Sequence, residues 1–156
     1  MSTDPTAHFA TPRVASGAVF ATDDAVLLVH KTYSNGWDLP GGYVDIGESP
    51  AAACEREVSE ELGLDRTVQR MLACDWAPND MEGDKILFMY DCGPLGDDES
   101  RIQLDGVELD AYEWVQLAKL GDYVIPRLDR RVRQAHAAWR DGVTLYLEHG
   151  KLRERP

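Results

Sequence analysis

Three glutamates within one predicted helix constrain this chain more than any other feature. Glu57, Glu60 and Glu61 are spaced i, i+3 and i+4, so they lie on one helix face, where like charges repel. The helix itself is predicted by Ser49, a good N-cap, and by Pro50, which suits the first helical position. Carboxylates gathered in this way need a compensating cation, and a hard divalent metal bound through carboxylate oxygens is the natural candidate.

An apolar stripe runs along the same segment, beside the carboxylates. The stripe consists of Ala51, Cys54, Val58 and Leu62, and the carboxylate face is centred about 100° around the helix from it. Gly63 suits the residue just past the helix end. One side of the helix can therefore pack on a core while the other faces a cleft. A solvated acidic surface is the alternative interpretation of three clustered glutamates taken alone.

A longer pattern includes these residues. Residues 42–64 follow G-x5-E-x7-R-E-U-x-E-E-x-G-U at every defined position, with U aliphatic. This is the Nudix box, and the chain resembles a Nudix hydrolase. The segments WDLPGG (37–42) before the box and EWV (113–115) after it are also similar to the family, which extends the resemblance over most of the chain.

The length and charge of the chain limit its class. With 156 residues, one domain is expected, with a flexible N-terminus over 1–11 and the domain over 12–156. No apolar run could span a membrane and no signal-peptide pattern is present, so a cytoplasmic protein without a membrane partner is predicted. The net charge of −12 argues against a nucleic-acid polymer as partner. It allows a small phosphorylated substrate if metals bridge the two.

Patterns along the chain predict an α/β fold. Small and β-branched residues at 14–20 and 25–31 predict a hairpin. Strands are expected at 67–76, 85–92 and 109–115, a loop at 93–100, a short helical turn at 115–120, an amphipathic helix at 125–140, and a short strand or ordered tail at 144–148. The resemblance implies the Nudix fold, an α/β/α sandwich with a mixed sheet between helices.

The resemblance also implies a reaction and a site. Nudix hydrolases split a diphosphate linked to another moiety, using water and Mg²⁺ or Mn²⁺. It implies that Glu57, Glu60 and Glu61 face the metal, with Glu57 and Glu61 as direct ligands and the Gly41 carbonyl as a further ligand. The structural support of the site is then provided by Gly42, Glu48 and Arg56, the last two as an ion pair that orients the ligands.

The general base stays open at this stage. In many family members a glutamate outside the box, on a loop before a late strand, positions or deprotonates the attacking water. Glu108 occupies the comparable place here. Glu57 or Glu60 could serve instead, as in other members.

Substrate recognition lies outside the motif. Trp37, Tyr43 and Trp76 could stack on a nucleobase, although each also suits a core or a cleft wall. Arg127 could neutralise phosphates, as could Arg13 and Lys31. Residues 123–130 contain no Asn, whereas family members that remove oxidised guanine nucleotides use one there. Pro78 stands 14 residues past the box and gives a weak indication of the ADP-ribose subgroup.

The predicted function is Mg²⁺- or Mn²⁺-dependent hydrolysis of a diphosphate linkage in a nucleoside diphosphate derivative. Nucleoside triphosphates, nucleotide sugars, ADP-ribose and non-nucleotide diphosphates all remain candidates for this small-molecule substrate. The alternative is a nucleotide-sensing module of the same fold without turnover. A prenyl-diphosphate isomerase is disfavoured because that chemistry needs a cysteine before the box. Family dimers are common, so a homodimer stays open.

Overall fold

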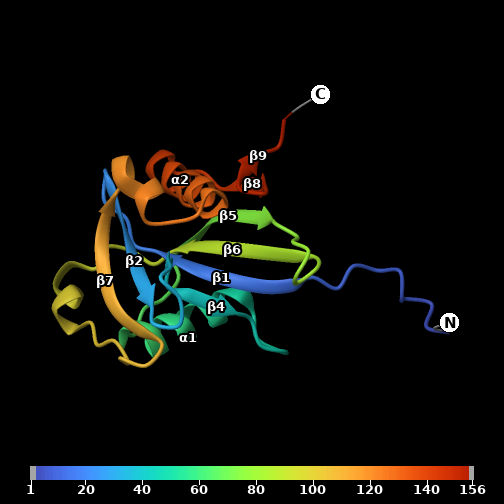
Figure 1. The fold of residues 1–156 in the computed structure, drawn as a ribbon, viewed down its shortest axis with the longest axis horizontal. Coiled ribbons are helices and arrows are strands. Elements are labelled where there is room, and N and C mark those ends of the chain that lie inside the picture. The colour runs from blue at the N-terminus through green and yellow to red at the C-terminus, as the bar shows by residue number, and fades with distance from the viewer. Residues whose placement is uncertain (1–2, 155–156) are drawn as a thin grey trace.

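Two β-sheets and two α-helices make up the fold in the computed structural model, which describes residues 3–154 (Figure 1). The strands are β1 (Arg13–Val19), β2 (Ala25–Lys31), β3 (Trp37–Asp38), β4 (Gly41–Tyr43), β5 (Arg70–Trp76), β6 (Lys85–Asp91), β7 (Leu109–Gln116), β8 (Leu145–Glu148) and β9 (Lys151–Leu152). The helices are α1 (Pro50–Leu62) and α2 (Pro126–Asp141), with short 3₁₀ helices η1 (Gly96–Arg101) and η2 (Leu117–Asp122).

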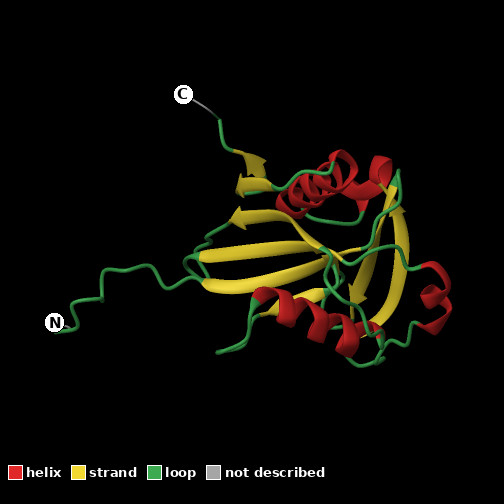
Figure 2. Ribbon diagram, turned by 180° about the vertical axis from the view of Figure 1, so that it is seen from behind, coloured by secondary structure: helices red, strands yellow, loops and turns green. Residues whose placement is uncertain are grey.

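The larger sheet is mixed and has the strand order β4-β1-β6-β5-β8-β9. The β1–β6 and β5–β8 pairs are parallel and its other pairs are antiparallel. The smaller sheet has the order β3-β2-β7. Helices α1 and α2 lie on opposite sides of the larger sheet (Figures 1 and 2). The prediction of an α/β fold with a mixed sheet between helices is confirmed.

Each face of the sheet has its own hydrophobic core. Val58 of α1 packs in one cluster with Ala18, whereas Val132 of α2 packs in the other with Val19. Neighbouring residues of β1 thus enter different cores because successive side chains of a strand point to opposite faces. Strands β1 and β6 therefore hold the two helices in a fixed relation to each other.

Helix α1 forms as its local signals predict. The Ser49 hydroxyl accepts a hydrogen bond from the Ala52 amide at 3.1 Å, Pro50 is the first helical residue, and Gly63 ends the helix with φ of 68°. Cys54, Val58 and Leu62 of the predicted stripe are fully buried, and Ala51 packs against them from a partly buried position.

The predicted hairpin of β1 and β2 forms only at its tip, where the Leu27 amide donates to the Phe20 carbonyl at 3.0 Å. A tight turn joins the strands, with the Thr22 amide bonded to the Ala25 carbonyl at 2.9 Å and a single bridge between Ala21 and Val26. Beyond it, β1 pairs with β4 and β6, whereas β2 pairs with β3 and β7 in the other sheet. The first five residues of β2 are all buried, as in a central strand that is covered on both faces and needs a partner at each edge.

The later elements follow the predictions closely. Strands β5, β6, β7 and β8 and helix α2 lie within a few residues of the predicted ranges, and the short helical turn is η2. The segment predicted as a loop at 93–100 contains η1, and β3, β4 and β9 were not predicted.

The chain ends leave the body of the molecule. Residues 3–12 form no strand or helix and extend away from the sheets (Figure 1). Residues 1–2 of the predicted N-terminal segment and residues 155–156 of the predicted domain lie outside the described residues. Within residues 3–154, no helix has the length and apolar character needed to cross a bilayer.

Candidate functional site

The free edge of β4 faces α1. On its other edge, β4 is bonded to β1 through Pro40, Gly42 and Val44, whose register is fixed by the Ala18–Pro40 and Val44–Val14 hydrogen bonds. Because bonded residues alternate along an antiparallel pair, the backbone groups of Gly41 and Tyr43 point away from β1. The Gly41 amide donates to Glu61 at 3.2 Å, and the Tyr43 carbonyl accepts from Arg56 at 3.1 Å. The box helix is thus fastened to a strand edge.

The three glutamates lie in three different environments. The Glu60 side chain is 59% exposed, the Glu57 side chain is 15% exposed, and Glu61 is buried. Glu60 and Glu57 both accept from Arg56, at 3.3 and 3.0 Å. A solvated acidic surface therefore describes Glu60 but not Glu57 or Glu61.

The half-buried Glu57 and the buried Glu61 form a pair of carboxyls. Burial raises the pKa of Glu61 to about 8, against the opposing effects of the Gly41 amide and of Lys31. Burial also raises the pKa of Glu57, although Arg56 opposes this shift. The interaction between the two carboxyls lowers the pKa of Glu57 and raises the pKa of Glu61. Ionising both at neutral pH therefore requires further positive charge beside them.

Arg56 joins the box loop to the helix. Its Nε and Nη2 donate to the two carboxylate oxygens of Glu48 at 2.8 and 2.9 Å, a bidentate pair. The hydrogen bond to Glu48 raises the pKa of Arg56, and the reverse interaction lowers the pKa of Glu48. Both groups are thus charged at neutral pH. The two residues form the predicted ion pair, and their role in orienting the ligands stays a prediction.

The donor set suits a cation held partly by the protein. Within residues 3–154, no three His, Cys, Asp or Glu side chains form a complete metal-binding group, and Glu60 is directed to Arg56. The available donors are the paired carboxylates of Glu57 and Glu61 and the adjacent backbone of Gly41. A Cβ at Gly42 would collide with the Glu57 carboxylate, so glycine is needed for this approach. Mg²⁺ prefers a ligand set of one or two carboxylates completed by water and substrate oxygens.

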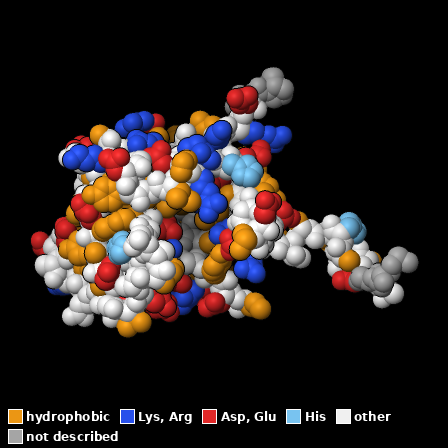
Figure 3. All heavy atoms as spheres, viewed as in Figure 1, with side chains coloured by type: hydrophobic (Ala, Val, Ile, Leu, Met, Phe, Trp, Pro, Cys, Tyr) orange, Lys and Arg blue, Asp and Glu red, His pale blue; other side chains and the backbone are white. Residues whose placement is uncertain are grey.

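A cleft begins at these glycines and runs to α2. Gly41, Gly42 and Tyr43 line one side, and Leu128 and Arg131 line the other, with a cavity volume of about 140 Å³. It shares Arg131 and Leu128 with a second hollow, of about 280 Å³. Figure 3 shows a hollow near the middle of this face, with Lys and Arg side chains beside it.

Four of the predicted substrate residues line these hollows, among them Lys31, which lines the cleft. Tyr43 lines the cleft, and its hydroxyl donates to Glu82. Trp37 and Arg127 line a further hollow next to it, where Trp37 is in edge contact with Tyr123 at 5.5 Å between ring centroids.

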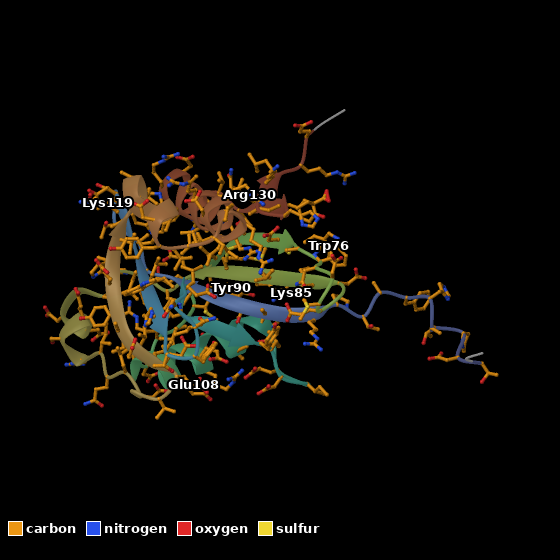
Figure 4. All side chains as sticks on the ribbon, viewed as in Figure 1. Trp76, Lys85, Tyr90, Glu108, Lys119 and Arg130 are labelled. Carbon is orange, nitrogen blue, oxygen red and sulfur yellow. The ribbon has the colours of Figure 1, made fainter. Side chains whose placement is uncertain are left out.

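Trp76 lies elsewhere. It is the last residue of β5, and Figure 4 shows it at the strand end. It is not one of the described residues that line these three hollows. The structure thus does not bring Trp76 together with the other predicted substrate residues.

Glu108 lies in the loop just before β7 (Figure 4). It is exposed, its amide donates to Asp105 at 3.0 Å, and its carbonyl accepts from Thr32 at 2.9 Å. These backbone bonds fix the loop. Among the described residues, these bonds do not bring a box glutamate into contact with the Glu108 side chain.

The cleft also contains charged residues for which the sequence assigned no site role. Asp38 lines it and accepts from Lys31 at 2.9 Å. Arg131 lines it from α2 and pairs with the fully buried Asp75 at 2.6 Å. A signal for this pair exists in the sequence, because Arg131 adjoins Val132 in the apolar stripe of α2, where a charged residue needs a buried partner.

The family is settled by a match of residues 11–139 to the NUDIX domain model. This chain belongs to the Nudix hydrolase family. A Bacillus subtilis protein named "Putative ADP-ribose pyrophosphatase YjhB" is 41% identical over 66 residues, which is 42% of this chain and 31% of that protein. The ADP-ribose pyrophosphatase of Methanocaldococcus jannaschii is 29% identical over 113 residues, 70% of this chain and 66% of that one. The match thus spans less than two thirds of each of these relatives.

A solved structure agrees with the fold of this Nudix chain. The MutT protein of Methanosarcina mazei superposes with a TM-score of 0.67 at 25% sequence identity. The superposition covers 85% of this chain and 96% of that one.

Proposed function

We propose that this Nudix chain hydrolyses a diphosphate linkage in a nucleoside diphosphate derivative, with Mg²⁺ or Mn²⁺. The observation that carries the proposal is the carboxyl pair of half-buried Glu57 and buried Glu61 beside the Gly41 backbone. Gly41 and Gly42, beside this pair, line a cleft that runs to α2.

The residues would divide the work as follows. A divalent ion supplies neutralisation of the phosphoryl oxygens and activation of water. Glu57 and Glu61 hold it, and the Glu48–Arg56 pair keeps Glu57 in place through the 3.0 Å bond from Arg56. Water attacks phosphorus and loses a proton to a carboxylate base, for which Glu108, Glu57 and Glu60 are the candidates. The bond from phosphorus to the bridging oxygen breaks, which gives two phosphorylated products.

The substrate within this class is left to experiment. The relative from Methanocaldococcus jannaschii is named an ADP-ribose pyrophosphatase, and one from Agrobacterium fabrum is named an RNA pyrophosphohydrolase. Both names describe cleavage of a phosphoric anhydride bond, which supports the reaction class. ADP-ribose, nucleotide sugars and nucleoside triphosphates are therefore the first compounds to test.

The test is release of phosphate or nucleoside monophosphate from this panel, with Mg²⁺ or Mn²⁺ and with EDTA. Glu61→Gln should lower metal-dependent turnover by about 100-fold or more, because it removes a charged ligand, and should leave the circular dichroism spectrum unchanged. Asp65→Asn is the matched control, since Asp65 is exposed just past α1. Turnover near the wild-type rate in Glu61→Gln would refute the assignment. Thermal stabilisation by a nucleotide without any turnover would favour the sensing module.

A further inference from the structure

Arg131 is a buried guanidinium whose outer nitrogens are left for a ligand. The residue is 8% exposed, and its Nε donates to Asp75 at 2.6 Å. Within the described residues, neither Nη1 nor Nη2 has a protein partner. Among these residues, the fully buried side-chain atom that lacks a partner is the Ser16 hydroxyl oxygen, so the two Arg131 nitrogens do not belong to that class. Arg131 lines both hollows at their junction. The free part of the fork therefore faces the cleft.

The partner of Arg131 fixes its orientation. Asp75 is fully buried on β5, and its other oxygen accepts from the Gly150 amide at 3.0 Å in the turn between β8 and β9. A buried ion pair is weak evidence for stability, because the desolvation of both charges offsets their attraction. A planar guanidinium held at one side matches the geometry of a phosphate or carboxylate at the other.

The charges around Arg131 favour an anion. Arg127 and Arg130 line the same hollow, as does Lys85, whose ammonium group is paired with Glu82 at 2.8 Å, and Figure 4 shows Lys85 and Arg130 on separate elements. Among the described residues that line it, Asp38 carries the acidic group, and that group is paired with Lys31. The chain as a whole has a net charge of −12, so its composition alone would predict an excess of acidic side chains around a hollow. This hollow has an excess of positive side chains instead.

We propose that Arg131, oriented by Asp75, binds a second anionic group of the substrate, a phosphate ester or a carboxylate outside the scissile diphosphate. The proposal rests on the proposed function, because the same cleft is lined by Gly41 and Gly42 near the carboxyl pair and by Arg131 near α2. It specifies the substrate class: a nucleoside diphosphate derivative with an additional negative charge on one of its two moieties.

Matched substrate pairs test this class and distinguish the two anion sources. ADP-ribose and its 2′-phosphate differ by one phosphate ester, and UDP-glucose and UDP-glucuronate differ by one carboxylate. The wild type should favour the charged member of at least one pair by about tenfold in kcat/KM, as expected of a charge-assisted bidentate contact. In the double variant Asp75→Asn/Arg131→Gln, which leaves no unpaired buried charge, the ratio should fall toward one.

Two further variants control this comparison. Arg133→Gln should keep the wild-type ratio, since Arg133 lies on the same helix but bonds Asp129 and the Leu117 carbonyl. Arg131→Lys keeps the charge beside Asp75 and loses the fork, so it should lower the ratio even if the double variant does not fold. Equal ratios in the wild type and in Arg131→Lys would overturn the proposal.

A readout without turnover separates this proposal from the proposed function. In EDTA, inorganic phosphate should raise the melting temperature of the wild type saturably, and should do so much less for Arg131→Lys. If this difference is seen but no compound is hydrolysed, the anion site stands and the proposed function fails. If compounds are hydrolysed but neither phosphate nor the charged substrates distinguish the two proteins, the function stands and the anion site fails.

Discussion

Glu57, Glu60 and Glu61 show how one helix spacing leads to three electrostatic environments. The Glu60 side chain is largely exposed to solvent, and Glu57 forms an ion pair with Arg56. Glu61 is buried and accepts a hydrogen bond from the Gly41 amide. The charge that needs compensation is therefore concentrated on the Glu57–Glu61 pair. A single cation at this pair would offset the repulsion and the cost of burial together.

The metal-free protein should lose stability as pH rises between about 4.5 and 8. The pKa of Glu61 is about 8 in the folded chain and has an ordinary value of 4.5, so the folded state retains a proton that the unfolded state has lost. Stability falls with pH wherever the folded state binds more protons. Glu57 adds a shift of the same sign. Thermal melts in EDTA across this range will measure the slope.

Variation of the metal and of Glu61 controls the pH experiment. Added Mg²⁺ should raise the melting temperature more at pH 8 than at pH 5, since it binds the ionised pair. Glu61→Gln should flatten the slope in EDTA, because its amide does not titrate. An equally steep slope in this variant would place the titrating group elsewhere.

Glu108→Gln tests the base outside the box. If Glu108 accepts the proton of water, turnover should fall by about 100-fold, the usual contribution of a general base, and the acid limb of the pH–rate profile should change. Asp110→Asn is the control, as an exposed carboxylate near the same strand start that pairs with His30. An unaltered profile in Glu108→Gln would point to Glu57 or Glu60.

Which residues meet in the cleft could be predicted only in part. The spacing of the box predicts that its glutamates share a face, but their depth of burial depends on where β4 lies, and no local pattern predicts a three-residue strand. The Asp75–Arg131 pair joins residues 56 positions apart. It follows from the packing of α2 on β5, which is a long-range event.

Among the elements, α1 has the most complete local signals. Its cap, its first-turn proline and its terminal glycine each satisfy the backbone at a helix end, so the sequence predicts both limits. The pairing of β1 and β2 could not be predicted in the same way. A two-residue turn between apolar runs fits a hairpin equally well, and competition from β6 and β7 for the strand edges decides the outcome.

Ser49→Ala should destabilise the protein by about 1 kcal/mol, the usual cost of removing an N-cap hydroxyl. The lost contact is the 3.1 Å bond from the Ala52 amide. Chemical denaturation will measure the difference in the free energy of unfolding. Ser59→Ala, at an exposed position of the same helix, should change it little. Equal effects of the two substitutions would show that the cap bond contributes nothing.

Across the entire chain, β1 and β6 connect the two cores. Ala18 and Val19 enter different clusters, as do Tyr90 and Met89. Each helix thus covers one face of the same two strands, and unfolding of either helix would expose that face to solvent. The box helix and the cleft wall formed by α2 are thereby held against one sheet. The site depends on this shared support.

Substitutions in the two cores should therefore weaken one common unfolding transition. Leu62→Ala in the α1 core should cost about 2–5 kcal/mol, and Val132→Ala in the α2 core somewhat less, about 1–3 kcal/mol, because each leaves a cavity. Both residues are fully buried. Calorimetry should show a single peak in each variant, with equal calorimetric and van't Hoff enthalpies. Two resolved transitions, with each variant shifting a different one, would mean that the helices belong to independently folding parts of the chain.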